Sequence, residues 1–353
     1  MLQTQHVFLI GSGEIEGLLD TLQLTYTKVK ELSEVPVGSE VVIDTNIKPG
    51  KKAIMEKKHN VKIYDRADVI LALFKKHASP LGSLQLKLIE MQRKYAIAGD
   101  IERLKLRRQI KIIKNKIARL QQVKENPLLK LKEKGYYIVP MVGYTNAGKS
   151  TLFNILIGKQ KAPTRDELFT TSIVRCGLLD LGIKVILTDT VGFIKDIPEK
   201  LIPAYHSTLN VMKISDLVIH VLDSSDHEIS SKKALGEEII KSYTNAPILT
   251  VMNKKDLIPS KKIASNAVLT SAVNKDLDNL LEEILNHLKP YEETIFLSYE
   301  KIQLLHTIPF TVHKKIEKLQ GGLRITLKGK KDIVKRTIAL LKKQSKNSKN
   351  PAP

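Results

Sequence analysis

The stretch GYTNAGKST (143–151) constrains the fold more than any other part of the sequence. It follows the apolar run YIVPMV (137–142) and opens a segment with helical character at Lys149. A Gly-x4-Gly-Lys-Ser/Thr pattern between a strand and a helix is typical of a loop that binds nucleotide phosphates. Glycines let backbone N–H groups approach a phosphate, and the helix N-terminus adds partial positive charge. The nucleotide-binding residues predicted here are Gly143, Tyr144, Thr145, Asn146, Ala147, Gly148, Lys149, Ser150 and Thr151.

Two side chains of this loop carry the chemistry that a nucleoside triphosphate requires. Lys149 is placed to reach the β- and γ-phosphates, and the hydroxyl group of Ser150 is placed to bind Mg²⁺. A glycine-rich turn without a ligand is the alternative, but the Gly-Lys-Ser-Thr ending argues against it. The sequence therefore predicts a nucleotide site that holds magnesium.

Strands and helices alternate along the residues that follow. Strand-like apolar runs occur at VILTDT (185–190), LVIHVLD (217–223) and ILTVMN (248–253), with helical patterns between them. Such alternation predicts a mostly parallel sheet with helices on both faces. We therefore expect an α/β fold whose nucleotide-binding domain spans residues 135–290.

The residues before this domain divide into two parts. HVFLI (6–10) and EVVIDTN (40–46) predict strands of an N-terminal α/β domain over residues 1–83. DVILALF (68–74) is either a third strand or a buried helix, because periodicity does not separate the two. Residues 84–126 predict a helical hairpin. The stretch from Pro127 through KLKEKG (130–135) predicts a linker.

The residues after the domain predict a small α/β element over 291–341. Within it, FTVHKKIEKL (310–319) has helical spacing and LRITLKG (323–329) is a strand candidate. The polar and basic residues 342–353 predict a disordered tail.

A second motif concerns the base. Asn253-Lys254-Lys255-Asp256 follows a strand, at the sheet edge where α/β proteins bind ligands. A carboxylate at Asp256 can accept hydrogen bonds from N1–H and the 2-amino group of guanine, and adenine lacks donors there. Lys254 could lie along the base plane, and Ser271-Ala272 could offer a backbone N–H to the guanine O6. The motif predicts selective guanine binding.

A third motif, Asp189-Thr190-Val191-Gly192, ends another strand. Asp189 is placed to hold Mg²⁺ through water, and the N–H group of Gly192 to sense the γ-phosphate. The next residue is Phe193, whose side chain cannot hydrogen-bond the attacking water. Slow intrinsic hydrolysis that a partner accelerates is therefore expected, and packing of Phe193 in the core is compatible with it.

The hairpin segment is strongly basic. Lys and Arg number 12 from Leu84 to Lys124, against three acidic residues, and Gly99-Asp100 interrupts the helical pattern. The apolar seam of the second helix consists of Leu106, Ile110, Ile113, Ile117 and Leu120. Its predicted RNA-binding face consists of Arg107, Arg108, Lys111, Lys114 and Arg119. A solvated helix face without a partner is the alternative.

The whole-chain charge agrees with a polyanionic partner. Lys and Arg total 58 against 37 acidic residues, giving a net charge of +21. We favour nucleic acid as the partner over a merely lysine-rich surface.

No apolar run approaches the ~20 residues of a membrane span. The lack of an export-signal pattern and the single Cys176 predict a reducing, cytoplasmic location.

Three segments together resemble the HflX family of ribosome-associated GTPases. They are GYTNAGKSTLFN (143–154), DTVGFIKDIPEKLIPAYHSTL (189–209) and DLVIHVLDSSD (216–226). YDRADVILALFKKHASPLGSLQLKLIEMQRKY (64–95) is similar to that family's N-terminal domain. The resemblance implies a P-loop GTPase that binds GTP and GDP and docks on the large ribosomal subunit and its RNA. It implies neither a DNA nor a membrane partner.

Two departures from the family pattern stand out. The family's glycine-rich loop between the hairpin helices is reduced to Ala98-Gly99-Asp100, and the switch-I segment LFTTSIVR (168–175) lacks a proline. The threonine that senses Mg²⁺ is Thr170 or Thr171, with Ser172 not excluded. Together with Lys149 and Gly192, Thr171 is assigned to the hydrolysis machinery.

Asn146 suggests one more cofactor. GTPases stimulated by potassium place an asparagine at this loop position, whereas capping of a local turn is the alternative.

The overall prediction is a GTPase acting in ribosome rescue, splitting or quality control. The alternative is an assembly or RNA-remodelling factor in which GTP acts mainly as a conformational ligand.

Overall fold

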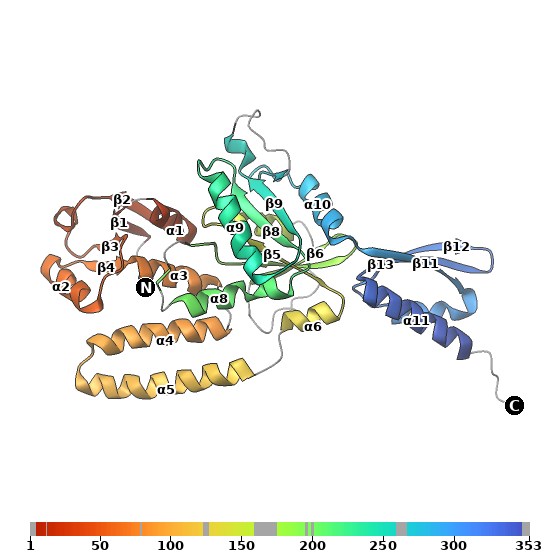
Figure 1. Cartoon of the computed structure of the whole chain (residues 1–353), viewed down its shortest axis with the longest axis horizontal. Helices are drawn as coiled ribbons and strands as arrows, with labels where there is room; N and C mark the ends of the chain where they lie inside the picture. Colours follow the sequence, from red (N-terminus) through yellow and green to blue (C-terminus); the bar gives the residue numbers. More distant parts are fainter. Residues whose placement is uncertain are drawn as a thin grey trace.

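The structure is a computed structural model, and it describes residues 5–11, 13–77, 80–122, 127–158, 175–194, 197–198, 201–258 and 267–347. Three sheets follow one another along the long axis of the molecule (Figure 1). A helical hairpin runs beneath the N-terminal sheet in that view. The expected α/β fold is confirmed.

The N-terminal sheet is parallel, with the strand order β2-β1-β3-β4. Its elements are β1 (His6–Ile10), α1 (Glu14–Leu22), β2 (Thr25–Lys28), the 3₁₀ turn η1 (Leu32–Glu34), β3 (Glu40–Ile43), α2 (Pro49–His59), β4 (Lys62–Asp65) and α3 (Arg66–His77). The segment 68–74 lies in α3, so it is a helix and not a third strand. Its residues Val69, Ile70 and Phe74 are fully buried, which explains why the run is almost wholly apolar.

The hairpin consists of α4 (Pro80–Ile97) and α5 (Asp100–Gln122). The helices break at residues 98–99, as the sequence predicts. Leu106 and Ile113 are buried. The five basic residues predicted for the outer face of α5 are all exposed. The expected linker after the hairpin is wrong in part, because residues 127–133 form α6 (Pro127–Glu133) and Leu128 packs against the central sheet.

The central sheet has the strand order β10-β9-β8-β5-β7-β6. Its strands are β5 (Tyr137–Val142), β6 (Arg175–Asp180), β7 (Lys184–Asp189), β8 (Val218–Asp223), β9 (Ile248–Asn253) and β10 (Val268–Leu269). Every pairing is parallel except β6 with β7, and β6 is a strand that the sequence analysis missed. The carboxyl ends of β5, β7, β8 and β9 therefore meet at one edge, which positions the candidate site.

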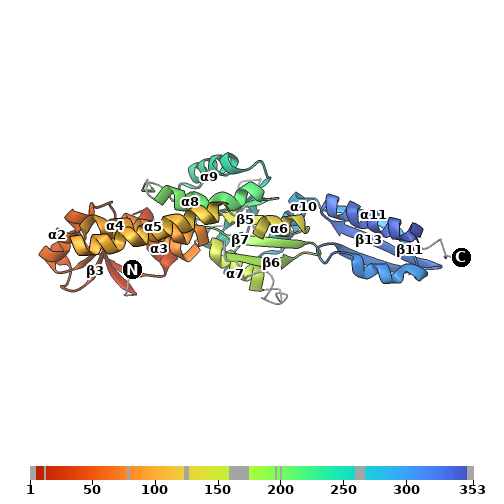
Figure 2. The same cartoon turned by 90° about the horizontal axis from the view of Figure 1, so that it is seen from below.

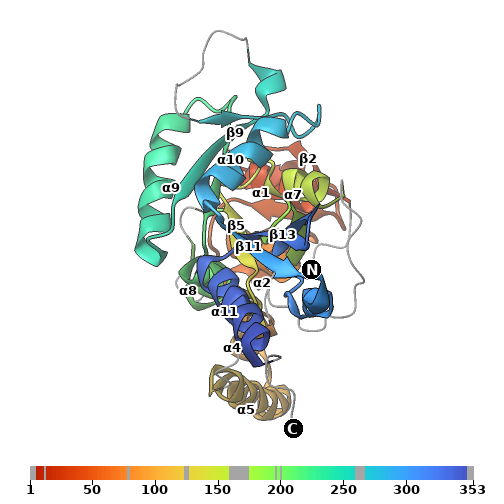
Figure 3. The ribbon, with the colours of Figure 1, turned by 90° about the vertical axis from the view of Figure 1, so that its right-hand side faces the viewer.

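Helices cover both faces of this sheet. They are α7 (Lys149–Gly158), α8 (Ile202–Leu209), the 3₁₀ turn η3 (Asn210–Ile214), α9 (Ile229–Tyr243), the 3₁₀ turn η4 (Lys255–Leu257) and α10 (Asp278–Leu288). Figure 3 shows α9 on one side of the sheet and α7 on the other. Helix α8 joins the central and N-terminal parts, since Tyr205 stacks on Phe74 with ring centroids 5.6 Å apart.

The C-terminal element is an antiparallel sheet with the strand order β11-β13-β12. It contains β11 (Tyr291–Ser298), the 3₁₀ segment η5 (Tyr299–Thr307), β12 (His313–Leu319), β13 (Gly322–Gly329) and α11 (Lys331–Asn347). Helix α11 packs on one face through apolar residues that include Ile333, Val334 and Leu341. In Figure 2, which looks from below, α11 lies in front of β11 and β13.

Two predictions for this element are wrong. Residues 310–319 are not helical, because 313–319 form β12. Val312, Ile316 and Leu319 imitate helical spacing, but a tight turn with Gly321 at φ 89° pairs the segment with β13. The expected disordered tail begins too early, because α11 continues to Asn347; residues 348–353 lie outside the described part.

No helix in the described ranges combines the length and the apolar character that a membrane crossing requires.

Candidate functional site

The phosphate loop links β5 to α7, and its glycines lie where side chains do not fit. A Cβ atom on Gly143 would lie 2.1 Å from the backbone oxygen of Val221, and one on Gly148 would lie 2.2 Å from Nδ2 of Asn253. Both glycines have positive φ angles, 145° and 84°. The sequence therefore needs glycine at these positions so that the loop can pack against β8 and β9.

Lys149 lies inside the loop and is buried. Its Nζ donates a hydrogen bond to the carbonyl oxygen of Tyr144 at 2.7 Å. Burial lowers the pKa of Lys149 to about 8, and the nearby Asp189 partly opposes this shift. A buried ammonium group is electrostatically costly, and an anion placed in the loop would offset that cost.

Asp189 ends β7 and is completely buried. Neither of its carboxylate oxygens has a hydrogen-bond donor among the described residues. The nearest cation shown is Arg175, whose Nη1 lies 3.6 Å from Oδ2 of Asp189. Such a carboxylate at the strand edge, with the Ser150 hydroxyl at the start of α7, is a donor set of hard oxygen atoms that suits Mg²⁺. The residues present therefore fit the predicted metal.

Gly192 and Phe193 lie against the loop. A Cβ atom on Gly192 would lie 2.7 Å from the backbone nitrogen of Thr145 and 2.9 Å from Nζ of Lys149. The N–H group of Phe193 donates to the carbonyl of Gly143 at 2.8 Å. The Phe193 side chain is 1% exposed and packs edge-on against Tyr144 and His220. Phe193 is therefore a core residue in this structure.

The guanine motif is tied to the phosphate loop by Asn253. Its Nδ2 donates to the carbonyl of Ala147 at 3.0 Å, and its Oδ1 accepts from the N–H of Ala272 at 3.1 Å. The structure thus brings together three segments far apart in the sequence. The N–H of Ala272, which the sequence offered to the guanine O6, is engaged with Asn253, so that contact is not confirmed.

Asp256 and Lys254 are each held by a neighbour. The Ser271 hydroxyl donates to Oδ1 of Asp256 at 2.5 Å, which leaves the other carboxylate oxygen to face a ligand. The ammonium of Lys254 lies 2.6 Å from Oδ2 of Asp223. Lys254 has a left-handed backbone with φ 63°. This conformation starts the turn η4 that carries Asp256.

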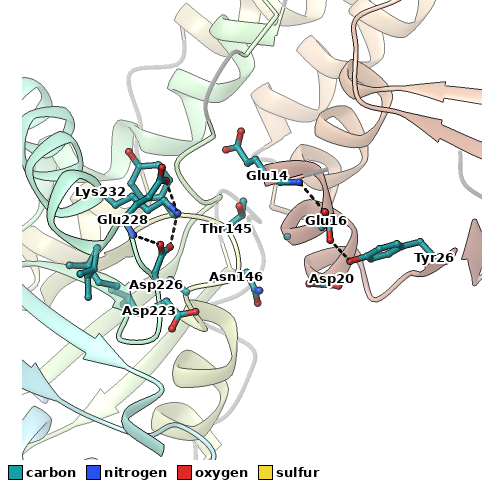
Figure 4. Close-up of a pocket in the computed structure, with 17 residues that line it drawn as sticks. Glu14, Glu16, Asp20, Tyr26, Thr145, Asn146, Asp223, Asp226, Glu228 and Lys232 are labelled. Atoms are coloured by element: carbon teal, nitrogen blue, oxygen red, sulfur yellow. Dashed lines mark hydrogen bonds and ion pairs between the residues drawn. The ribbon is translucent and has the colours of Figure 1, made fainter. Parts of the chain in front are cut away.

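A cavity of about 580 Å³ adjoins the phosphate loop (Figure 4). Thr145 and Asn146 lie between its two walls, one formed by α1 and the other by the end of β8 and the start of α9. Its acidic residues are Glu14, Glu16, Asp20, Asp223, Asp226 and Glu228. Asn253, Asp256 and Ser271 do not line it. The cavity therefore lies beside the phosphate loop and not over the guanine motif.

The switch-I candidates Thr170, Thr171 and Ser172 fall in residues 159–174, outside the described part of the chain. The sequence analysis missed two residues that the structure brings to the site. Asp223 ends β8, and it could have been predicted in the same way as Asp189, because both are carboxylates at the carboxyl end of a strand. Arg175 stacks over Phe153 and contacts Asn154 and Asp189, and its position depends on the β6–β7 pairing, for which the sequence gives no signal.

Known proteins resemble this chain in sequence. Residues 138–254 match the family model described as "50S ribosome-binding GTPase". A protein named GTPase HflX from Caldanaerobacter subterraneus subsp. tengcongensis is 32% identical over 332 residues, which cover 83% of this chain and 75% of that protein. GTPase HflX from Methanocaldococcus jannaschii is 30% identical over 320 residues, covering 79% and 75%.

A solved structure shares the fold. The crystal structure of a GTP-binding protein from Sulfolobus solfataricus in complex with GDP has a TM-score of 0.53 and 23% identity, covering 80% of this chain and 98% of that one. This identity supports the fold alone. The sequence relationships go further and, with the site geometry above, lead to one conclusion: the chain belongs to the HflX family of GTPases and hydrolyses GTP.

Proposed function

We propose that this GTPase binds the large ribosomal subunit and acts in ribosome rescue, splitting or quality control in the cytoplasm. The observation that carries the proposal is the exposed basic face of α5. Its residues are Arg107, Arg108, Lys111, Lys114 and Arg119. None of the five has an ion-pair partner within the described ranges. Cations left unpaired on a rigid helix are well suited to ribosomal RNA phosphates.

The nucleotide chemistry follows from the residues of the site. Lys149 neutralises phosphate charge, and the N–H group of Gly192 is the candidate sensor of the γ-phosphate. Ser150 and Asp189 would hold Mg²⁺, which supplies positive charge to the phosphates when bound. Asp256 selects guanine. We assign the second metal-sensing role to Thr171 or Thr170, on the sequence pattern alone.

Hydrolysis is expected to be slow without a partner. Phe193 occupies the position after Gly192, and its buried ring offers the attacking water no hydrogen bond. The polar help must come from another part of this chain, from a bound cation or from the ribosome. The same observation supports a second candidate function, in which GTP mainly orders an assembly or RNA-remodelling factor.

Two measurements test these functions. Co-sedimentation with separated ribosomal subunits, in GDP and in a non-hydrolysable GTP analogue, should show binding to the large subunit that depends on the nucleotide. Single-turnover GTP cleavage should accelerate strongly when large subunits are added. Binding without acceleration would favour the assembly factor, and no binding to either subunit would contradict both proposals.

A further inference from the structure

Three helices that are distant in the sequence lie on one side of the molecule. Helices α5, α6 and α11 form its lower side in Figure 1, and Figure 2 shows them along the long axis. Helix α5 covers α4 from below, α6 packs against the central sheet, and α11 covers β11 and β13 from below. The surfaces that they leave exposed therefore face the same way.

The outer face of α11 is basic, like that of α5. Its buried residues Ile333, Val334, Ile338 and Leu341 occupy one side of the helix, and the exposed cations occupy the other. These cations are Lys331, Lys335, Arg336, Lys342 and Lys343. Asp332 is the one exposed acid in residues 331–343. Arg336 and Lys343 are seven residues, or about two turns, apart and thus lie in one row.

The helices higher in Figure 1 differ in charge. On α9, Lys233 and Lys241 are each within 4.0 Å of Glu237, so their charge is largely balanced. Helix α10 carries Asp278, Glu282 and Glu283 without a lysine or arginine. Acids thus balance the cations of α9 and make α10 acidic, whereas α5 and α11 carry a clear excess of cations. A surface that was lysine-rich throughout would not show this division.

The composition of the basic helices indicates which polyanion they suit. None of α5, α6 and α11 contains an aromatic residue. Proteins that bind single strands rely on aromatic side chains on which bases stack. A straight row of cations without such rings suits the phosphates of a double helix.

We propose that α11 is a second anchor for the double-helical RNA that α5 contacts, so that one RNA body lies along α5, α6 and α11. This inference rests on the proposed ribosomal function, and it assigns a role to the C-terminal element, residues 291–347. The element then sets how the GTPase domain is oriented on the RNA. Helix α6 contributes less, since its exposed Lys130 and the adjacent Lys134 are offset by Glu133.

The test uses the full chain and two variants with the same change in net charge. Arg336→Gln/Lys343→Gln removes two cations from α11, and Lys233→Gln/Lys241→Gln removes two from α9. Binding to a fluorescent RNA duplex of about two helical turns, and to a single strand of equal length, is measured across KCl concentrations. Each lost phosphate contact lowers the log–log salt slope by about 0.9, so the α11 variant should lose about 2 in slope. Its duplex affinity should fall about tenfold or more at 0.1 M KCl, while the α9 variant stays close to the unmodified chain.

Fluorescent GDP binding serves as the folding control, and all proteins should bind it equally. Equal duplex binding by the α11 and α9 variants would overturn the inference. Tighter binding of the single strand than of the duplex would overturn it as well.

Failure of the proposed function gives a different result. In that case the unmodified chain does not sediment with large subunits, whatever it does with the duplex. If Arg107→Gln/Arg108→Gln weakens subunit binding and the α11 variant does not, the ribosomal function stands and the second anchor is wrong.

Discussion

The guanine half and the phosphate half of the nucleotide site differ in how far their polar groups are already paired. In the guanine half, Asn253, Asp256 and Lys254 each have a partner at 3.1 Å or less. In the phosphate half, Asp189 has no hydrogen-bond donor within the described residues, and Lys149 bonds only to a carbonyl of its own loop.

This difference indicates separate roles for the two halves. A paired, hydrogen-bonded network is rigid, and it can reject a base whose donors do not match. Buried charges that lack full compensation gain a large binding free energy when an anion and a metal are bound beside them. We infer that the guanine half provides selectivity and the phosphate half provides most of the binding energy and the response to nucleotide state. The predictions below test that division.

The largest effect is expected from Lys149→Ala. Removing the ammonium group that meets the phosphates should weaken GTP and GDP binding by a factor on the order of 10² or more. Fluorescent nucleotide titration measures this loss. Thermal unfolding without nucleotide should change little, because the buried ammonium is itself costly to the fold.

Lys241→Ala is the matched control, since Lys241 is exposed and lies near Glu237 on α9, away from the guanine motif and the phosphate loop. It should bind nucleotide normally. If Lys149→Ala binds GTP as tightly as this control does, the phosphate half does not supply the binding energy.

Asp256→Asn tests the guanine half. The amide reverses one hydrogen-bonding group, so affinity for GTP should fall by about 10² and affinity for xanthosine triphosphate should rise. Competition of both nucleotides against fluorescent GDP gives the two values. Asp276→Asn, which changes a nearby carboxylate paired with Lys255, should alter neither. Unchanged GTP affinity in Asp256→Asn would remove the base assignment.

The sequence predicts the motif residues of both halves and misses contacts that depend on the rest of the fold. The guanine motif, Asp189 and the phosphate loop follow from motif residues at strand ends, because parallel strands must end at one edge. The role of Arg175 was not predictable, since it needs the antiparallel β6 and the side chains of α7 around it. The β12 error has a related cause: pairing with β13 overrides helical spacing. In both cases the structure depends on contacts between segments that are distant in the sequence, and a local sequence pattern does not show such contacts.

His220→Leu tests how the buried residues behind Phe193 make the stability of the protein depend on pH. His220 lies behind Phe193, and both ring nitrogens are buried without a partner in the described structure. Burial, together with the charges of Lys149 and Lys233, lowers the pKa of His220 to about 4. The unfolded chain binds this proton near pH 6.5 and the folded chain does not, so stability falls as the pH drops from 6.5 to 4.

The His220→Leu variant should not lose this stability at low pH, because leucine does not bind a proton. Relative to its own value at pH 7, the free energy of unfolding at pH 4.5 should be higher than in the unmodified chain by about 2–3 kcal/mol. Urea unfolding at the two pH values measures the difference. His306→Leu, which alters an exposed histidine in η5, is the matched control. Equal acid sensitivity of His220→Leu and the unmodified chain would show that this histidine is protonated at little cost in the folded protein.

The smallest effect concerns Asn146 and a monovalent cation. Its side chain is exposed, and its backbone is left-handed with φ 64°, a turn conformation that asparagine adopts readily, so both the turn role and the potassium role remain predictions. Asn146 borders the cavity beside the phosphate loop. A potassium ion beside the phosphates would add positive charge to the phosphate half, where Phe193 offers the attacking water no hydrogen bond. GTP turnover should therefore be several-fold faster in KCl than in NaCl at equal ionic strength, and Asn146→Ala should remove this difference while leaving GDP affinity nearly unchanged. Equal rates in the two salts would exclude potassium and leave the ribosome as the source of acceleration.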